Sequence, residues 1–165
     1  MSVPFLVHPV LVAFAAREYT SDEDIIVAAI LHDTIEDCGV TTAELTKIFN
    51  KNVSRIVKEV SAPKTKEKNW KRKKERYLKF VSKASKESLL IVGIDKMLNM
   101  EAYFESIVKG QLNPTNNMFG GAIEGYFWYY DEILKIIRPK LKNSLIVKDY
   151  QKKLNYYKTK LVDYL

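Results

Sequence analysis

The chain has 165 residues, of which 47% are hydrophobic and 28% charged, with only six glycines and five prolines. This composition is typical of one globular domain with a sizeable core, and it argues against a loop-rich all-β fold. A single cysteine, Cys38, excludes an internal disulfide and is typical of a reducing cytoplasm. No apolar run approaches the roughly 20 residues of a membrane-spanning helix, and the first residues carry no secretory signal pattern. We therefore expect a soluble, cytoplasmic protein with no membrane partner.

The formal net charge is +7, and the excess is concentrated in residues 64–86 and in the C-terminal third of the chain. Local basic clusters suit a polyphosphate ligand as well as they suit DNA or RNA. Charge alone therefore does not decide between a small phosphorylated ligand and a nucleic acid.

Apolar residues at steps of three and four predict an all-α fold. The predicted helices cover residues 8–18, 22–33, 41–49, 51–60, 70–84, 86–109, 123–138 and 141–165. Polar loops are predicted at residues 61–69 and 112–117. Residues 1–110 would form the core of one domain, and residues 111–165 would add C-terminal helices that pack on the same domain. The last helix also has the spacing to pack on a second subunit, which leaves a homo-oligomer open.

Local signals set several of the helix ends. Ser21, followed by Asp24, resembles an N-cap for the second helix. Thr41 with Glu44 three residues later is a capping box for the third. Pro139 is predicted to break the helix that precedes it, because proline lacks the backbone N–H that a helix interior needs.

An apolar run at residues 25–31 ends abruptly in the pair His32-Asp33, and the acidic pair Glu36-Asp37 follows one helical turn later. Helix positions four apart share a face, so three carboxylates and an imidazole would crowd one helix end. A divalent cation would neutralise the repulsion and use these groups as ligands. The alternative is a helix that leaves the core with a solvated acidic end.

Two further polar residues interrupt apolar stretches. His8 lies within the apolar residues 4–11, and Asp95 follows the apolar run 89–94. An isolated polar side chain in such a run needs a partner, because burying it alone is costly. A metal site built from His8, His32, Asp33 and Asp95 would give each of them one. On ligand type alone such a set suits Mn²⁺, with Fe²⁺, Zn²⁺ or Mg²⁺ as alternatives.

The order of these residues resembles the H…HD…D signature of the HD phosphohydrolase superfamily. Three segments are similar to its alarmone hydrolase branch, the (p)ppGpp 3′-pyrophosphohydrolases of the RelA/SpoT type and their small single-domain relatives. PFLVHPVLVA at residues 4–13 is similar to PY-x-x-HP-x-x-VA, AAILHDTIED at 28–37 to AALLHDTIEDT, and DKMLNM at 95–100 to D-[RK]-L-H-N-M. The similarity covers roughly residues 3–110.

The resemblance implies a single HD-domain helical bundle with Mn²⁺ as its cofactor. The implied metal ligands are His8, His32, Asp33 and Asp95. Glu36 and Asp37 would activate water and protonate the leaving group, and Asn99 and Lys96 would bind the substrate. The implied reaction is hydrolysis of guanosine 3′,5′-bis(diphosphate) at its 3′-pyrophosphate, which gives GDP or GTP plus pyrophosphate.

This chain departs from the family pattern at positions that concern the substrate. The family normally has a helix before the HP segment; this sequence begins seven residues before His8, so the helix is either absent or lies outside this sequence. Leu98 replaces the family histidine, and Ile94 replaces a small residue. Another nucleotide or phosphoester is therefore an alternative substrate. A degenerate HD domain that binds a nucleotide or nucleic acid is a further alternative, but the retained acids and both histidines argue against it. We expect a small nucleotide rather than a nucleic acid.

Two helices allow a structural and a functional interpretation. The basic positions of the helix at 70–84 are expected to form a solvated face, with contact to substrate phosphates as the alternative. These positions are Lys71, Arg72, Lys73, Lys74 and Arg76. The aromatic residues 126–130 are expected to pack in the core, with stacking on a base as the alternative.

Overall fold

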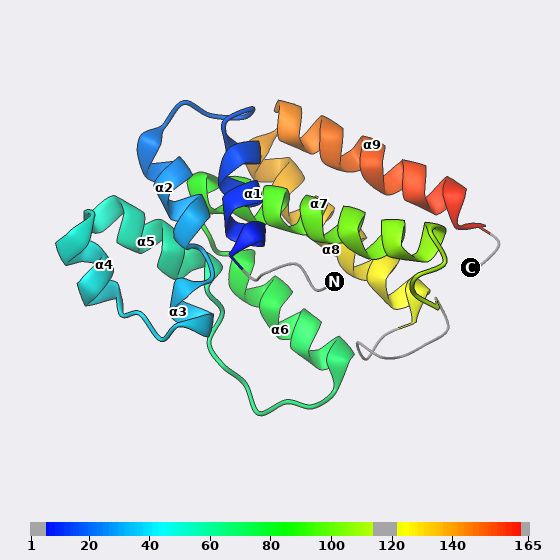
Figure 1. The fold of residues 1–165 in the computed structure, drawn as a ribbon, viewed down its shortest axis with the longest axis horizontal. Coiled ribbons are helices and arrows are strands. Elements are labelled where there is room, and N and C mark those ends of the chain that lie inside the picture. The colour runs from blue at the N-terminus through cyan, green and yellow to red at the C-terminus, as the bar shows by residue number, and fades with distance from the viewer. Residues whose placement is uncertain (1–5, 114–121, 163–165) are drawn as a thin grey trace.

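The computed structural model describes residues 6–113 and 122–162, and the predicted loop at 112–117 lies mostly outside them. Within these two segments the regular elements are α-helices, which confirms the predicted all-α fold (Figure 1). The helices are α1 (Val7–Ala16), α2 (Glu23–Leu31), α3 (Thr34–Asp37), α4 (Thr42–Ile48), α5 (Lys51–Val60), α6 (Trp70–Val81), α7 (Lys86–Val108), α8 (Ile123–Leu141) and α9 (Leu145–Lys160). None of the helices in the described segments has both the length and the apolar content to span a membrane.

The helices begin where side chains supply hydrogen-bond acceptors for free backbone N–H groups. Thr41 and Glu44 form the predicted capping box at the start of α4. The prediction of Ser21 as the cap of α2 is wrong, because Asp22 occupies that position and accepts from the N–H groups of Asp24 and Ile25. A carboxylate at this position also interacts favourably with the helix dipole.

Pro139 does not break its helix, contrary to the prediction. It lies inside α8, which continues to Leu141. A proline removes one backbone N–H, and here the loss falls in the last turn, where helices fray in any case. The turn that follows is made by Lys142, whose φ of 52° ends the helix.

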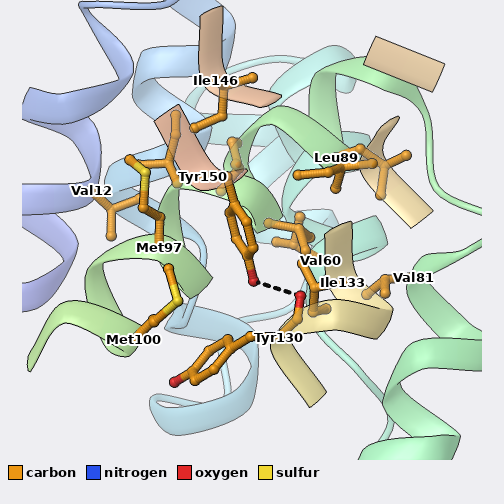
Figure 2. Close-up of a cluster of buried hydrophobic side chains, with 14 of the residues drawn as sticks. Val12, Val60, Val81, Leu89, Met97, Met100, Tyr130, Ile133, Ile146 and Tyr150 are labelled. Carbon is orange, nitrogen blue, oxygen red and sulfur yellow. Dashed lines mark hydrogen bonds between the residues drawn. The ribbon is translucent and has the colours of Figure 1, made fainter. Parts of the chain in front are cut away.

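The longest helix, α7, crosses the middle of the molecule and packs against α1, α2 and α5 as well as α8 and α9 (Figure 1). A Cβ atom added at Gly93 would lie 3.3 Å from Ile146 Cγ1, so the glycine allows α7 and α9 to approach closely. Figure 2 shows Tyr150 of α9 within this core, where its hydroxyl donates to the Tyr130 carbonyl at 3.2 Å. The core thus fixes the position of α7, the helix that carries Asp95.

The basic helix α6 is placed by α8. The Trp70 ring packs against Tyr126 with ring centroids 5.0 Å apart, and it covers Gly125, where an added Cβ would be 3.3 Å from the indole. At the other end of α6, the Lys140 ammonium donates to the carbonyls of Ser82 and Ala84. The C-terminal helices α8 and α9 pack on α7, but the division of the chain at residue 110 stays a prediction.

Candidate metal centre and its cleft

Three predicted ligands from distant parts of the chain meet at one point. His8 comes from the first turn of α1, His32 from the residue after α2, and Asp95 from the middle of α7. One ligand atom from each lies within 4.8 Å of the other two. His8 Nε2 is 2.9 Å from Asp95 Oδ1, and His32 Nε2 is 4.0 Å from the same oxygen. The packing of α1 and α2 on α7 therefore builds a group of candidate divalent-metal ligands.

The orientation of the His32 ring leaves a lone pair without a partner. His32 Nδ1 lies 2.8 Å from the Ala29 carbonyl oxygen, which only accepts, so Nδ1 carries the proton and donates. The ring is 4% exposed, and its Nε2 has no hydrogen-bond partner among the described residues. Its near neighbours are Asp33 Oδ2 at 3.1 Å, outside hydrogen-bond geometry, and Asp95 Oδ1 at 4.0 Å.

A neutral imidazole nitrogen that faces two carboxylates is unfavourable unless a positive charge lies between them. Burial lowers the pKa of His32, but the carboxylates of Asp33 and Asp95 outweigh burial and raise this pKa above its ordinary value. The centre therefore favours positive charge. In a metal-ligating histidine, one ring nitrogen usually donates to a backbone carbonyl or carboxylate and the other binds the metal. His32 has this arrangement, because Nδ1 donates to the Ala29 carbonyl and Nε2 is left free. The donor set fits a divalent cation.

Asp95 is ionised and held from several sides. Burial raises the pKa of Asp95, but the Lys96 ammonium and the His8 ring reverse the effect and hold this pKa below its ordinary value. Lys96 pairs with Oδ2, and the Asn99 amide donates to Oδ1. The two residues predicted to bind substrate are thus partners of Asp95 in this structure, and their contact with a substrate stays a prediction.

Asp33 and the acidic pair lie beside this group. Asp33 reaches His32 but is not among the three residues whose ligand atoms cluster, so its role as a fourth ligand stays a prediction. The helix is interrupted after Leu31, and Glu36 and Asp37 belong to the short helix α3. Asp33 is the N-cap residue of α3, so Asp33, Glu36 and Asp37 lie just beyond the end of α2 rather than on one continuous helix with His32.

Glu36 is held towards the interior of the site. Its Oε1 accepts a 2.6 Å hydrogen bond from the N–H of Ala62, which lies in the loop before α6. Burial raises the pKa of Glu36, and the Ala62 hydrogen bond works against that rise. Asp37, in contrast, is exposed at the rim.

A cleft of about 590 Å³ is lined by His32, by acidic residues and by basic and aromatic residues. The acidic lining residues are Asp33, Glu36, Asp37 and Asp95. We call the lining residues Lys64, Trp70, Lys73, Lys74, Tyr77, Tyr126 and Tyr129 the basic wall; Lys96, beside Asp95, lines the cleft as well. A second cavity of about 460 Å³ shares Lys74, Lys96, Tyr126 and Tyr129 with the first. The arrangement is suited to an anionic ligand held between a metal site and a basic wall.

Lys73 and Lys74 of α6 belong to this wall and are functional candidates. The sequence-based prediction missed them, because it favoured a solvated face for all the basic positions of this helix. Lys73 and Lys74 line the cleft, whereas Lys71 and Arg72 do not. A signal was present in the spacing. Positions 73 and 74 lie between Trp70 and Tyr77 at helical steps of three and four, so they share the face that packs inwards. The predicted aromatic packing is observed, because Tyr126, Tyr129 and the Phe127 ring are buried.

Comparison with known proteins adds independent findings. A family model described as "HD domain" matches residues 1–103. A probable guanosine-3′,5′-bis(diphosphate) 3′-pyrophosphohydrolase of Mycoplasma pneumoniae is 28% identical over 93% of this chain, and the aligned region spans 24% of that relative's length. The chain therefore corresponds to about a quarter of this curated relative.

Two solved structures have a similar fold. One is the Listeria monocytogenes EGD-e protein lmo0812, with a TM-score of 0.74 and 21% identity over 95% of this chain and 99% of that one. The other is described as a metazoan ortholog of SpoT that hydrolyzes ppGpp, with a TM-score of 0.65 and 24% identity over 96% of this chain and 82% of that one. At these identities the likeness concerns the fold.

Proposed function

This chain belongs to the HD-domain family, and on that basis we propose that it is a metal-dependent phosphohydrolase acting on guanosine 3′,5′-bis(diphosphate). The reaction is removal of the 3′-pyrophosphate, which leaves GDP, or GTP from the pentaphosphate, and releases pyrophosphate. The observation that carries the proposal is the His32 lone pair, which faces Asp95 and Asp33 without a hydrogen-bond partner. The activities named for the M. pneumoniae relative and the metazoan ortholog support the choice of substrate.

We propose Mn²⁺ as the cation, because two imidazole nitrogens with carboxylate oxygens form a mixed ligand set that suits it. His8, His32 and Asp95 would hold it, and Asp33 is the candidate for a fourth ligand. When bound, such a cation polarises a phosphoryl oxygen and makes water a stronger acid at neutral pH. Few protein ligands leave room for water and substrate, as a catalytic site requires.

Glu36 is the residue that we assign to water activation. Its Oε1 is fixed by the Ala62 N–H, which leaves Oε2 to accept a proton from a water in the cleft. Asp37, exposed at the rim, is assigned to protonation of the leaving group. Lys96 and Asn99 hold Asp95 in the free protein, and both also line the second cavity, from which they would reach the phosphates or the sugar.

A second candidate function is hydrolysis of another phosphoester. It is favoured by Leu98, which stands where the family has a histidine and is partly buried against the core. A leucine there offers no hydrogen bond to a ligand, so recognition of guanosine would have to rely on other groups. The cytoplasmic location and a homo-oligomeric state stay predictions, as does the absence of a nucleic-acid partner.

The decisive experiment is release of pyrophosphate from ppGpp by Mn²⁺-loaded protein, with EDTA-treated protein as the control. Metal-dependent turnover supports the alarmone hydrolase. Bound metal without turnover would reject ppGpp and direct the assay to other phosphoesters. A protein that binds no metal under these conditions would contradict the metal-dependent mechanism itself.

A further inference from the structure

Lys74 is a cation of the cleft wall that has no acidic partner. Its ammonium lies 4.4 Å from the centroid of the Tyr129 ring and 5.6 Å from that of Trp70. No carboxylate lies within 4.0 Å of it in the described parts of the chain. Lys96, which lines the same cleft, is 18% exposed and is neutralised by Asp95. The two lysines thus differ in their ion pairs: Lys96 is paired with the Asp95 carboxylate, and Lys74 is paired with no carboxylate among the described residues.

This position is unfavourable for a cation in the free protein. Burial lowers the pKa of Lys74 to about 8, with a smaller contribution from repulsion by Lys96. The aromatic faces of Tyr129 and Trp70 compensate only in part, since a cation–π contact contributes on the order of 0.5–2 kcal/mol. A partly desolvated ammonium next to aromatic rings therefore gains most from an anion that brings its own negative charge.

The surroundings of Lys74 select the kind of anion. It borders both the 590 Å³ cleft and the 460 Å³ cavity, so an anion beside it lies between the two. Charged or titratable groups near it are Lys73 on its own helix, Asp95 and Lys96 on α7, and Tyr129 on α8. Because Asp95 neutralises Lys96, the net positive charge beside Lys74 comes from Lys73. A lysine ammonium suits phosphate oxygens as a compact charge with three donors, so two neighbouring lysines favour a phosphate-bearing anion.

We propose that Lys74 binds a phosphate group of an oligophosphate ligand, with the ring of Tyr129 behind the ammonium, and so positions that ligand against the metal centre. The identity of the ligand as a substrate rests on the proposed function, but anion binding by Lys74 does not. Lys74 is thus one residue of the basic helix that recognises the ligand, and Lys73 beside it in the cleft lining could do so too, while Lys71 and Arg72 outside the cleft belong to the solvated face of the helix.

Binding of inorganic pyrophosphate to the full chain, with no added metal, tests this directly by isothermal titration calorimetry. We expect Lys74→Gln to weaken binding by about 10- to 100-fold, because a hydrogen bond to a charged group contributes on the order of 1.5–3 kcal/mol. Lys71→Gln is the matched control, since Lys71 lies on the same helix over the Trp128 ring at 5.5 Å but does not line the cleft. Its affinity should stay within about twofold of the wild type.

Lys74→Arg should restore most of the affinity, because the charge and donors are kept. Equal affinity of Lys74→Gln and the wild type would overturn the proposal, and so would an equal loss in Lys71→Gln, which would indicate a general charge effect. Circular dichroism of each variant separates loss of fold from loss of binding. Since these measurements follow pyrophosphate binding without turnover, their failure is distinct from a failure of the enzyme to hydrolyse ppGpp.

NMR of the lysine side chains gives a readout that a purely structural role would not move. The Lys74 signal should titrate near 8 in the free protein. With saturating pyrophosphate this midpoint should rise by about one unit or more, because an opposite charge favours the ammonium. A midpoint unchanged by pyrophosphate would contradict direct contact.

Discussion

Asp95 is the residue on which the candidate site depends. It brings together His8, Lys96 and Asn99 through one carboxylate in the interior of α7. Because the same side chain is a proposed metal ligand and the counter-ion of a buried lysine, we expect two separable effects of its removal.

Asp95→Ala should lose bound metal and activity together. The free energy of unfolding should also fall, on the order of 3–5 kcal/mol, because Lys96 is left buried without its acid. Inductively coupled plasma mass spectrometry measures the metal, and pyrophosphate release measures activity. Asp95→Asn also removes the charge that Lys96 needs, but it keeps the volume and an oxygen that can accept from Asn99, so it should destabilise the fold less than Asp95→Ala. Stoichiometric metal in folded Asp95→Ala protein would show that Asp95 is not a ligand.

Glu36→Gln should keep the metal but lower kcat by about 10²- to 10⁴-fold, the usual contribution of general acid–base catalysis. Its amide oxygen still accepts from the Ala62 N–H, so the local geometry is preserved while the base is lost. Glu23→Gln, an exposed glutamate at the start of α2, is the control. An active Glu36→Gln enzyme would rule out the assigned role.

The same residue gives a pH prediction. Burial raises the pKa of Glu36 above the ordinary 4.5, so the carboxylate needed as a base is lost at a higher pH than in a free glutamate. The rate should therefore fall on the acid side from a midpoint above 4.5, and Glu36→Gln should lack this limb. A pH–rate profile of kcat/KM between pH 4 and 8 measures it.

At the scale of single residues, the sequence predicts which residues meet at the candidate metal centre better than which lysines line the cleft. His8 and Asp95 were recognisable because each interrupts an apolar stretch, where an unpartnered polar group needs an explanation. Lys74 was not distinguishable from Lys71, because the difference arises only when α6 packs on α8. The pairing of Lys96 with Asp95 likewise depends on the tertiary environment.

At the scale of elements, Glu59 joins α5 to the start of α7. It accepts from the Ser85 N–H and the Ser88 hydroxyl, and Arg55 pairs with it from one turn earlier on α5. Burial alone would raise the pKa of Glu59, but these hydrogen bonds lower it to about 2. The charged form is therefore the one that holds the two helices together.

Glu59→Gln should lower the free energy of unfolding by about 1–3 kcal/mol at pH 7, since hydrogen bonds to a charged acceptor are weakened. A carboxylate with a depressed pKa contributes stability above its ordinary value of 4.5, and this stability is lost as the pH falls towards 2. The difference between variant and wild type should therefore shrink across that range in urea unfolding followed at 222 nm. A constant difference down to pH 2 would contradict the assignment.

The helices themselves were largely predictable, and their ends were less so. The range 51–60 agrees with α5, because its apolar residues repeat at helical steps between clear end signals. The N-cap of α2 and the end of α8 differ from the predicted ones. Ser21 and Asp22 are both good N-cap residues, and Pro139 falls in the last turn of α8, which tolerates it. Such competition between neighbouring signals is decided by packing rather than by the local sequence.

At the scale of the whole molecule, one segment dominates the charge. Residues 64–86 contain eleven lysines and arginines against two glutamates, an excess larger than the +7 of the complete chain. This segment includes the basic wall of the cleft. A polyanionic substrate should therefore be drawn towards the cleft over a distance set by the ionic strength.

Raising the salt concentration from about 0.02 M to about 0.5 M should lower kcat/KM for ppGpp by about 10-fold or more, with a smaller change in kcat. A triple variant of Lys66, Lys68 and Arg72 to glutamine, all exposed, should show a flatter dependence. These residues do not line the main cleft, so kcat should be kept. Stopped-flow or steady-state rates across the salt series test this, and an unchanged slope in the variant would argue against steering.

Bound Mn²⁺ should stabilise the whole fold, because its proposed ligands come from α1, from the end of α2 and from α7. At about 100 times the Kd the gain is about 2.7 kcal/mol, which corresponds to a rise in Tm of roughly 5–10 °C for a protein of this size. Differential scanning calorimetry with and without Mn²⁺ measures the shift. Asp95→Ala should show none, and an equal shift in that variant would place the metal elsewhere.

The packing of α6 on α8 has a consequence for how the substrate preference of such a protein can evolve or be engineered. Trp70 on Gly125 and the Lys140 contacts set the position of α6, and among the described residues none of them pairs with His8, His32 or Asp95. If the proposed roles hold, the part of ligand recognition that belongs to α6 is therefore encoded apart from the proposed metal ligands. We expect libraries that vary the α6–α8 boundary to yield new substrate preferences while the catalytic ion is retained, which makes this boundary the natural target for directed evolution.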